Sequence, residues 1–269
     1  DKTSFQTSNS VVLGTQQKVF SIHKDFVLGG GIISQGFEIP GNELDRKGAF
    51  VQSTFGKLTQ AGMQISPESD RSFYARVTHY PITNKFPIHT QTAASTNMYF
   101  SSWLPERHSL LLKLSGMYTQ QKISSSFGAS SIAYSTVADS VGPQFLMRGH
   151  LSGHFIGKTA LSPMVEYRFP LREINRGSGT DPFFIRRLHG ALSQDGMMVD
   201  GFVYRKASAS YARDQFNGYY SNLGGELRLD TVVGYVLPIK FVVGHYVPLD
   251  MAVGGDSQTA FSLQINQFF

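Results

Sequence analysis

Apolar and polar side chains alternate along short segments of this chain from one end to the other. In residues 259–269, for example, Phe261, Leu263, Ile265 and Phe269 fall on one face, while serine, glutamine and asparagine fall on the other. A period of two is the side-chain period of a β-strand, whereas an amphipathic helix repeats about every 3.6 residues. The alternation therefore predicts strands that each have one apolar and one polar face.

Eleven segments with this pattern or a close variant of it are spread over the whole chain. They are residues 10–22, 25–37, 48–58, 72–82, 90–103, 108–120, 160–171, 187–199, 226–235, 239–249 and 259–269. Membrane barrels normally have an even number of strands, so an indistinct further strand in the first fifty residues would make twelve. At roughly 22 residues per strand and connection, the chain length favours twelve strands over the alternative of sixteen.

The composition separates a membrane β-barrel from a soluble β-protein. Only 16% of the residues are charged, while the chain contains 21 phenylalanines and 12 tyrosines. A soluble β-sandwich or lipocalin-like barrel is the alternative for the same alternation, but it would need more charge on its exterior. We therefore predict an all-β fold in which residues 1–269 form a single transmembrane antiparallel β-barrel domain of the bacterial outer membrane.

Short and long connections alternate between the predicted strands. The segments 104–107 and 236–239 are short, whereas 120–145 and 206–221 are long and rich in Ser, Gly, Tyr and Asn. This is the pattern of periplasmic turns and extracellular loops, which places the loop with Arg148 on the extracellular side. Aromatic residues near these connections predict belts at the two membrane interfaces. They are Tyr99, Phe100 and Trp103 at one end and Tyr204, Tyr211, Tyr219 and Tyr220 at the other.

The sequence offers little support for catalysis. Residues 153–159, "GHFIGKT", look like a phosphate-binding loop, but the spacer is one residue short and Pro163 follows where a helix should begin. His150 and His154 are four residues apart, yet they lie in a loop or strand start and not on a helix that would bring them together on a metal. Basic residues are scattered, which argues against nucleic acid. We expect no enzyme activity, no cofactor and no metal.

An ordered series of segments carries a family resemblance. "FLMRGH" follows a long loop, "VEYRFPL" lies on the next strand, and "MYFSSWLPERHSLLLKLSGMY" precedes the loop as a strand pair. With five strands after "MRGH" and a last strand ending in Phe, this order resembles the BamA/TamA-type outer-membrane assembly superfamily, which includes surface-exporting two-partner transporters. The resemblance covers about Phe73 to Phe269.

The resemblance implies a long loop folded into the barrel lumen, with an Arg-Gly pair at its tip. Arg148 and Gly149 take those positions, between Met147 and His150. In the family the arginine contacts acidic and aromatic groups of the inner wall. Two differences from the family pattern are His150, where an aromatic residue is usual, and "LSQDG", where the family has Phe-x-Asp-x-Gly.

The alternation then nominates wall residues for this arginine. It turns Glu166 and Arg168 inward, and Asp195 lies on the inward face of residues 187–199. A guanidinium in a confined lumen needs acceptors for its five donors, so we expect Arg148 to pair with Glu166, Asp195 or both. The last strand, with Phe261, Leu263, Ile265 and Phe269, is expected to serve also as a recognition signal for the assembly machinery of the cell.

Three functions remain open on this basis. The resemblance favours an assembly or translocation barrel that aids insertion or export of proteins or lipids. The alternatives are a passive small-solute pore and a structural membrane-anchor barrel. The expected partners are membrane lipids and lipopolysaccharide, and either unfolded outer-membrane clients or envelope partner proteins. The 269 residues leave no room for the periplasmic POTRA modules of the family, so we expect a member that lacks them or the barrel part of a larger chain.

Overall fold

The computed structural model places the chain in one antiparallel β-sheet. It describes residues 7–21, 25–39, 42–56, 65–66, 70–83, 88–120, 125–127, 145, 147–150, 155–177, 182–234, 236–250 and 253–265. Apart from Val253, which is in a 3₁₀ conformation, the helical residues among these form a single 3₁₀ turn, η1 (Lys206–Ser208). No described helix is long and apolar enough to cross a membrane. The prediction of an all-β antiparallel fold is therefore confirmed.

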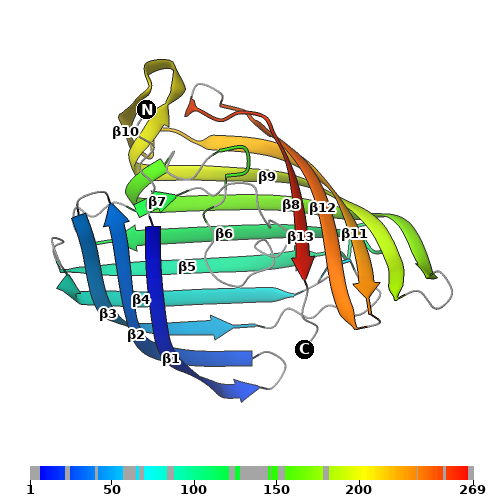
Figure 1. Cartoon of the computed structure of the whole chain (residues 1–269), viewed down its shortest axis with the longest axis horizontal. Coiled ribbons are helices and arrows are strands. Elements are labelled where there is room, and N and C mark those ends of the chain that lie inside the picture. The colour runs from blue at the N-terminus through cyan, green and yellow to red at the C-terminus, as the bar shows by residue number, and fades with distance from the viewer. Residues whose placement is uncertain are drawn as a thin grey trace.

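Eleven strands follow one another across the sheet in chain order, each antiparallel to its neighbours (Figure 1). Each of the eleven segments predicted from alternation overlaps one of them. A twelfth strand on this path is not among the described residues. The strands are β1 (Thr7–Ser21), β2 (Asp25–Ile39), β3 (Asn42–Phe55), β4 (Arg71–Thr83), β5 (His89–Phe100), β6 (Ser109–Thr119), β8 (Phe155–Gly177), β9 (Phe183–Arg205), β11 (Tyr220–Val233), β12 (Leu237–Pro248) and β13 (Gln258–Ile265).

Two short strands lie off this path. β7 (Ser125–Phe127) pairs with the start of β8, and β10 (Ser210–Gln215) pairs with the end of β9. The predicted long loop at 206–221 is therefore largely a hairpin, because β9 continues to Arg205, turns through η1 and pairs with β10. The β8–β9 and β11–β12 connections lie at the opposite end, where the Gly234 amide donates to the Pro182 carbonyl at 2.7 Å.

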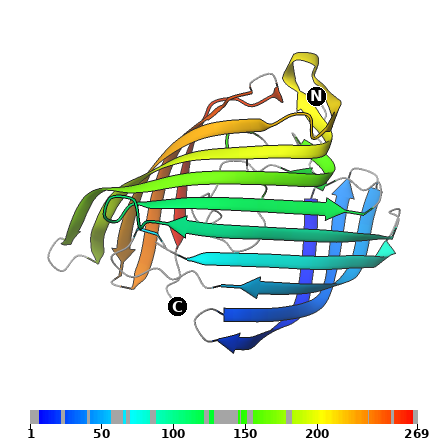
Figure 2. The same ribbon diagram turned by 180° about the vertical axis from the view of Figure 1, so that it is seen from behind.

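The sheet curls on itself. Figure 1 shows β4 to β9 as a wall behind, with β1 to β3 and β11 to β13 crossing in front of it, and Figure 2 shows the wall from its other side. β1 pairs with β2 and β13 pairs with β12. In the part of the chain that the structure describes, β1 and β13 are not paired with each other.

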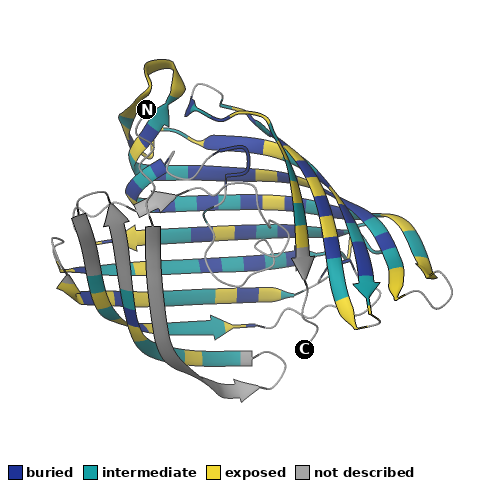
Figure 3. Ribbon diagram, viewed as in Figure 1, coloured by how far each residue is buried: buried dark blue, intermediate teal, exposed yellow. Residues whose placement is uncertain are grey.

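Burial is inverted relative to a soluble protein. On β11, Glu226 and Arg228 are 5% and 1% exposed, while Leu223 and Leu227 on the other face are 49% and 51% exposed. The same alternation of buried and exposed residues is visible along β8 to β12 in Figure 3. Soluble domains bury apolar side chains and expose charged ones. We refer to the face with the buried charged residues as the inner face and to the other as the outer face.

Two aromatic residues of the predicted belts have a different place. Tyr99 and Tyr220 are each only 2% exposed. Tyr99 shares the inward phase of Asn97 and Ser95 on β5, and Tyr220 packs in an apolar cluster at the start of β11. These two therefore point inward and cannot be part of an outward belt, whereas Trp103 is 67% exposed.

Candidate functional site

Residues Met147–His150 form a tight turn that presents the Arg148 side chain. The His150 amide donates to the Met147 carbonyl at 3.1 Å, and Gly149 has a φ of 84°. That backbone conformation favours glycine, and a Cβ at Gly149 would also lie 3.2 Å from the Pro248 ring. The backbone conformation of the turn thus requires a glycine directly after Arg148.

The residues on either side of Arg148 anchor this turn. Met147 is fully buried in an apolar cluster, and His150 is fully buried with its ring 5.7 Å from that of Phe155. The Gly149 carbonyl accepts from the Asp256 amide at 3.2 Å, which ties the turn to the connection between β12 and β13. The remaining members of the apolar cluster are Phe155, Ala160, Met197, Val199, Val203, Tyr220 and Val253.

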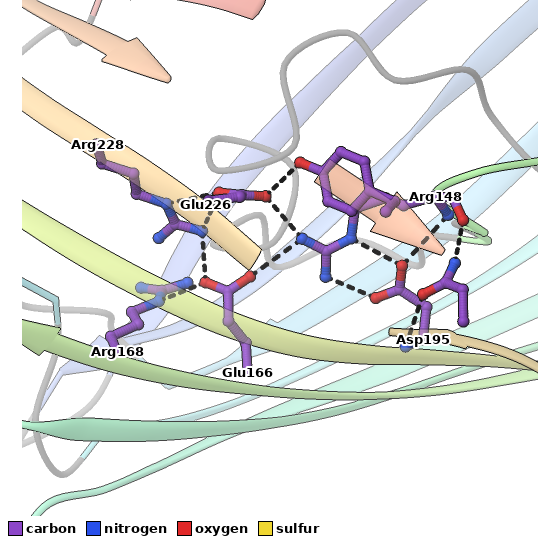
Figure 4. A network of polar contacts seen from close by, with 8 residues as sticks. Arg148, Glu166, Arg168, Asp195, Glu226 and Arg228 are labelled. Carbon is purple, nitrogen blue, oxygen red and sulfur yellow. Dashed lines mark hydrogen bonds and ion pairs between the residues drawn. The ribbon is translucent and has the colours of Figure 1, made fainter. Parts of the chain in front are cut away.

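Arg148 binds Asp195 of β9 in a two-pronged contact. Its Nε donates to Oδ2 at 2.7 Å and its Nη2 donates to Oδ1 at 2.6 Å (Figure 4). The Arg148 backbone amide adds a third donor to Oδ2 at 3.3 Å. Parallel N–H···O bonds between guanidinium and carboxylate fix orientation as well as charge. Asp195 therefore sets both the position and the direction of Arg148.

The third nitrogen of the guanidinium reaches two further strands. Nη1 donates to Glu226 Oε1 of β11 at 2.8 Å and to Glu166 Oε2 of β8 at 3.4 Å. One loop residue thus contacts carboxylates on β8, β9 and β11 at once, and all four side chains are at most 1% exposed. This contact holds the loop against three neighbouring strands of the sheet.

Two more arginines complete the cluster. Arg168 Nε donates to Glu166 at 2.7 Å, and Arg228 donates to both Glu226 and Glu166, each at 2.7 Å. Three arginines therefore face three carboxylates, and their charges cancel. Balance matters because a buried charge without a partner is costly. We refer to Arg148, Glu166, Arg168, Asp195, Glu226 and Arg228 as the inner ion cluster.

The carboxylates also keep Arg148 charged. Burial alone lowers the pKa of the guanidinium, but Asp195, Glu226 and Glu166 outweigh burial and hold that pKa well above its ordinary value. Every carboxylate in the cluster accepts from at least one arginine. Such an arrangement is suited to holding a loop in place and not to moving protons.

Two neutral residues close the cluster around Arg148. Tyr246 of β12 donates its hydroxyl to Glu226 Oε1 at 2.7 Å, and its ring centre lies 5.4 Å from the Arg148 Cζ atom. The Asn222 side-chain amide donates to the Arg148 carbonyl. Space for these groups comes from small residues, because Gly224 lies opposite Tyr246 and Gly244 lies opposite Glu226.

The sequence prediction and the structure agree on the centre of this cluster. The structure brings Arg148, Glu166 and Asp195 together. Arg168, which was also predicted to face inward, is 1% exposed and joins the cluster through its contact with Glu166. Sequence reasoning missed four residues. They are Asn222, Glu226, Arg228 and Tyr246.

A signal for two of the missed residues exists in the sequence. Glu166 and Arg168 are spaced as Glu-x-Arg on β8, and Glu226 and Arg228 repeat that spacing on β11. In each pair the arginine Nε donates to its own strand's glutamate at 2.7 Å. Repetition of an inward Glu-x-Arg on two strands could thus have nominated the second pair.

The predicted C-terminal signal is only partly described. Phe261 and Leu263 are 74% and 56% exposed on the outer face. Ile265 is the last residue of β13, and Phe269 lies outside the described residues. Among the residues that are described, no group of three or more His, Asp or Glu side chains is placed to hold a metal.

Comparisons with known proteins do not place the chain in a family. No family model matches it, and no curated protein matches it. The site must therefore be interpreted from its own geometry.

Proposed function

We propose that this protein is a transmembrane β-barrel of the bacterial outer membrane that belongs with the BamA/TamA-type assembly and translocation proteins. The inverted burial supports the membrane part of this proposal. Leu192, Leu227 and Val243, each on a different strand, are 56%, 51% and 41% exposed on the outer face. Lipid would cover such an apolar surface, whereas its exposure to water would be unfavourable.

Barrel closure is part of the proposal. β1 and β13 are the two edges of an eleven-strand path, and unpaired edges in lipid would leave backbone groups without partners. A twelfth strand at the seam between them would complete an even-numbered barrel. Heated and unheated samples compared by gel electrophoresis test closure, because a closed barrel resists unfolding in detergent and migrates differently until it is boiled.

One observation carries the assembly role, namely the anchoring of a loop arginine to carboxylates on three adjacent strands. This inner ion cluster braces β8, β9 and β11, while β1 and β13, the two ends of the strand path, are not paired with each other in the described residues. A barrel with one braced wall and one weak seam is suited to opening sideways for a client protein or lipid.

The test is an insertion assay. Vesicles that contain this protein should accelerate the folding of an unfolded outer-membrane protein, and Arg148→Ala should lower that acceleration. The chain contains no cysteine, so a single disulfide can be introduced between the two strands that meet at the seam. The crosslinked protein should lose the acceleration and regain it on reduction. Equal acceleration by empty vesicles would contradict the assembly role.

The polar inner face favours a second candidate, a passive small-solute pore. Planar-bilayer recordings separate the two proposals. Stable single-channel steps together with no effect on client folding would support the pore. If the protein neither conducts ions nor accelerates client folding, a structural membrane anchor is the remaining function.

The C-terminal strand is proposed to act also as a signal for insertion of the protein itself. The support is the alternation that ends in Phe269, with Phe261 and Leu263 exposed. Phe269→Lys should lower insertion in cells more than it lowers folding into detergent. Equal effects on both would remove the signal role and leave an ordinary lipid-facing strand.

A further inference from the structure

A β-bulge interrupts the pairing of β3 with β4. Lys47 is opposite Ile82 and Ala49 is opposite His79, so that Tyr80 and Pro81 both face the single residue Gly48. Bulges bend a strand and redirect side chains locally. Here the extra residue leaves Pro81 and Ile82 exposed in succession.

An apolar groove of about 360 Å³ lies over this bulge. Ile32 of β2 and Ile82 of β4, which are 61% and 64% exposed, line it together with Pro81. Gly48 and Ala49 add little side-chain volume to its lining. A Cβ at Gly48 would lie 2.9 Å from Tyr80 Cδ1, so the small residue is required there. The volume is within the range of ligand pockets, roughly 300–1,000 Å³.

The groove lies on the outer face, near one end of the sheet. Val51 on the same face of β3 is 65% exposed, as expected of the surface that we propose to contact lipid. β2 ends at Ile39, β3 begins at Asn42 and β4 ends at Thr83, so the groove is near this end of all three strands. Because β4 and β5 are antiparallel and β5 runs on to the short connection at 101–108, this is the end opposite that connection.

Lys47 gives the groove a charge. It is an exposed lysine, and it lines an otherwise apolar cavity. Lysine near a membrane interface attracts anionic head groups and can extend its aliphatic stem along apolar surface. An apolar slot with a cation at its rim is complementary to a molecule with an apolar chain and an anionic end.

We propose that this groove binds one acyl chain of an anionic, phosphate-bearing membrane lipid, with the lipid phosphate at Lys47. The inference rests on the proposed membrane-facing exterior, and it adds a specific lipid site to that surface. Ile32, Pro81 and Ile82 contact the chain, and the bulge supplies the depth. The site lies on the strands next to the seam and far along the sheet from the inner ion cluster.

Tryptophan quenching by brominated lipids tests this proposal. Trp103 is the single tryptophan, so Trp103→Phe removes all native tryptophan fluorescence. In that background Val51→Trp puts a reporter beside the groove without altering its lining, and Leu192→Trp puts a matched reporter on the outer face of β9. Each variant is reconstituted in vesicles that contain brominated phosphatidylglycerol or brominated phosphatidylcholine in an unbrominated background.

The Val51→Trp reporter should prefer the anionic lipid by about fivefold, which corresponds to about 1 kcal/mol for one lysine at an anionic surface. The Leu192→Trp reporter should show no preference. Lys47→Gln should remove the preference, and Ala49→Leu, which fills the groove, should reduce quenching at Val51→Trp by both lipids.

The possible outcomes distinguish a failure of the proposed lipid site from a failure of the proposed membrane barrel. Equal quenching by the two lipids at Val51→Trp, or a preference that survives Lys47→Gln, would overturn the groove proposal and leave the barrel standing. If neither reporter is quenched by any brominated lipid in folded protein, the membrane-facing exterior is wrong and both proposals are overturned.

Discussion

The two halves of the sheet accommodate inward cations in different ways. In the half formed by β8 to β12, Arg148 and its neighbours contact carboxylates at 2.6–2.8 Å. In the half formed by β2 to β5, Arg76 lies over the Phe50 ring at 4.0 Å and Arg46 lies over the Tyr80 ring at 4.6 Å. Arg76 also donates to the Thr78 hydroxyl at 3.1 Å, and Arg46 Nη1 lies 3.3 Å from His89 Nε2, so these contacts are with neutral groups, whereas those in the other half are with carboxylates.

This difference indicates which half is rigid. Paired charges in a dry site demand defined geometry, because a small displacement leaves a buried charge without its partner. A cation over an aromatic ring is attracted with much less directional demand, and the interaction is weaker where water reaches it. We therefore expect β8 to β12 to form the stable wall and β2 to β5 to form the more deformable one.

The sharpest test of this difference is Arg148→Ala. Removing the arginine leaves Asp195, Glu166 and Glu226 buried with too little positive charge, and we expect a loss of about 3–5 kcal/mol in the free energy of unfolding. Urea unfolding in detergent, followed by intrinsic fluorescence, measures the loss. Arg148→Lys keeps the charge but lacks the planar guanidinium, so its free energy of unfolding should fall between those of the parent and of Arg148→Ala. An alanine variant as stable as the parent would show that the cluster is not a brace.

Tyr246→Phe removes one hydroxyl and keeps the ring. Because that hydroxyl donates to the buried Glu226 carboxylate at 2.7 Å, we expect a loss of about 1.5–3 kcal/mol. Tyr118→Phe is the control, since Tyr118 is 52% exposed on β6. Similar small effects at both positions would mean that Glu226 is better hydrated than its burial indicates.

Gly149→Ala strains the turn that carries Arg148 without touching a charge. An alanine at a φ of 84° and 3.2 Å from Pro248 should cost about 1–2 kcal/mol. Gly116→Ala on β6 should be close to neutral, because its Cβ would meet only atoms at 3.8 Å or beyond. If the two variants melt at the same temperature, the turn does not determine how the loop is held.

Arg76→Ala probes the other half and should have the smallest effect. Loss of its contact with the Phe50 ring should cost about 0.5–1 kcal/mol. Unfolding under the same conditions as for Arg148→Ala gives the comparison directly. A loss as large as that of Arg148→Ala would abolish the distinction between the two halves.

Alternation predicted the strands well because a period of two needs no knowledge of the partner strand. The same phase turned Glu166 and Asp195 inward, which was sufficient to nominate them once "MRGH" had been noticed. It could also have oriented Tyr99, which shares the phase of Asn97. The membership in the BamA/TamA superfamily itself stays a prediction.

Other features could not be predicted from one sequence. Tyr246 meets Arg148 only because the β11–β12 register sets it opposite Gly224. The apolar groove depends on a register shift between Lys47 and Ala49, and a shift of one residue has no distinct sequence signature. The β9–β10 hairpin is predicted as a loop from the sequence because residues 206–221 are rich in Ser, Gly, Tyr and Asn. Contacts that depend on register require coordinates.

The central claim is that the buried charged face is the inside of a membrane barrel and the apolar face is its outside. Three consecutive residues of β12 test it most directly, because Phe241 and Val243 are 37% and 41% exposed while Val242 is 5% exposed. None of the three belongs to the inner ion cluster, and the chain has no native cysteine.

Nitroxide labels at single cysteines at these three positions, in protein reconstituted in vesicles, report collision with oxygen dissolved in lipid or with a water-soluble nickel complex. We predict that labels at positions 241 and 243 collide with oxygen and not with nickel, and that the label at 242 collides poorly with oxygen. If 242 is the lipid-accessible position, or if nickel reaches 241 and 243, the account is contradicted.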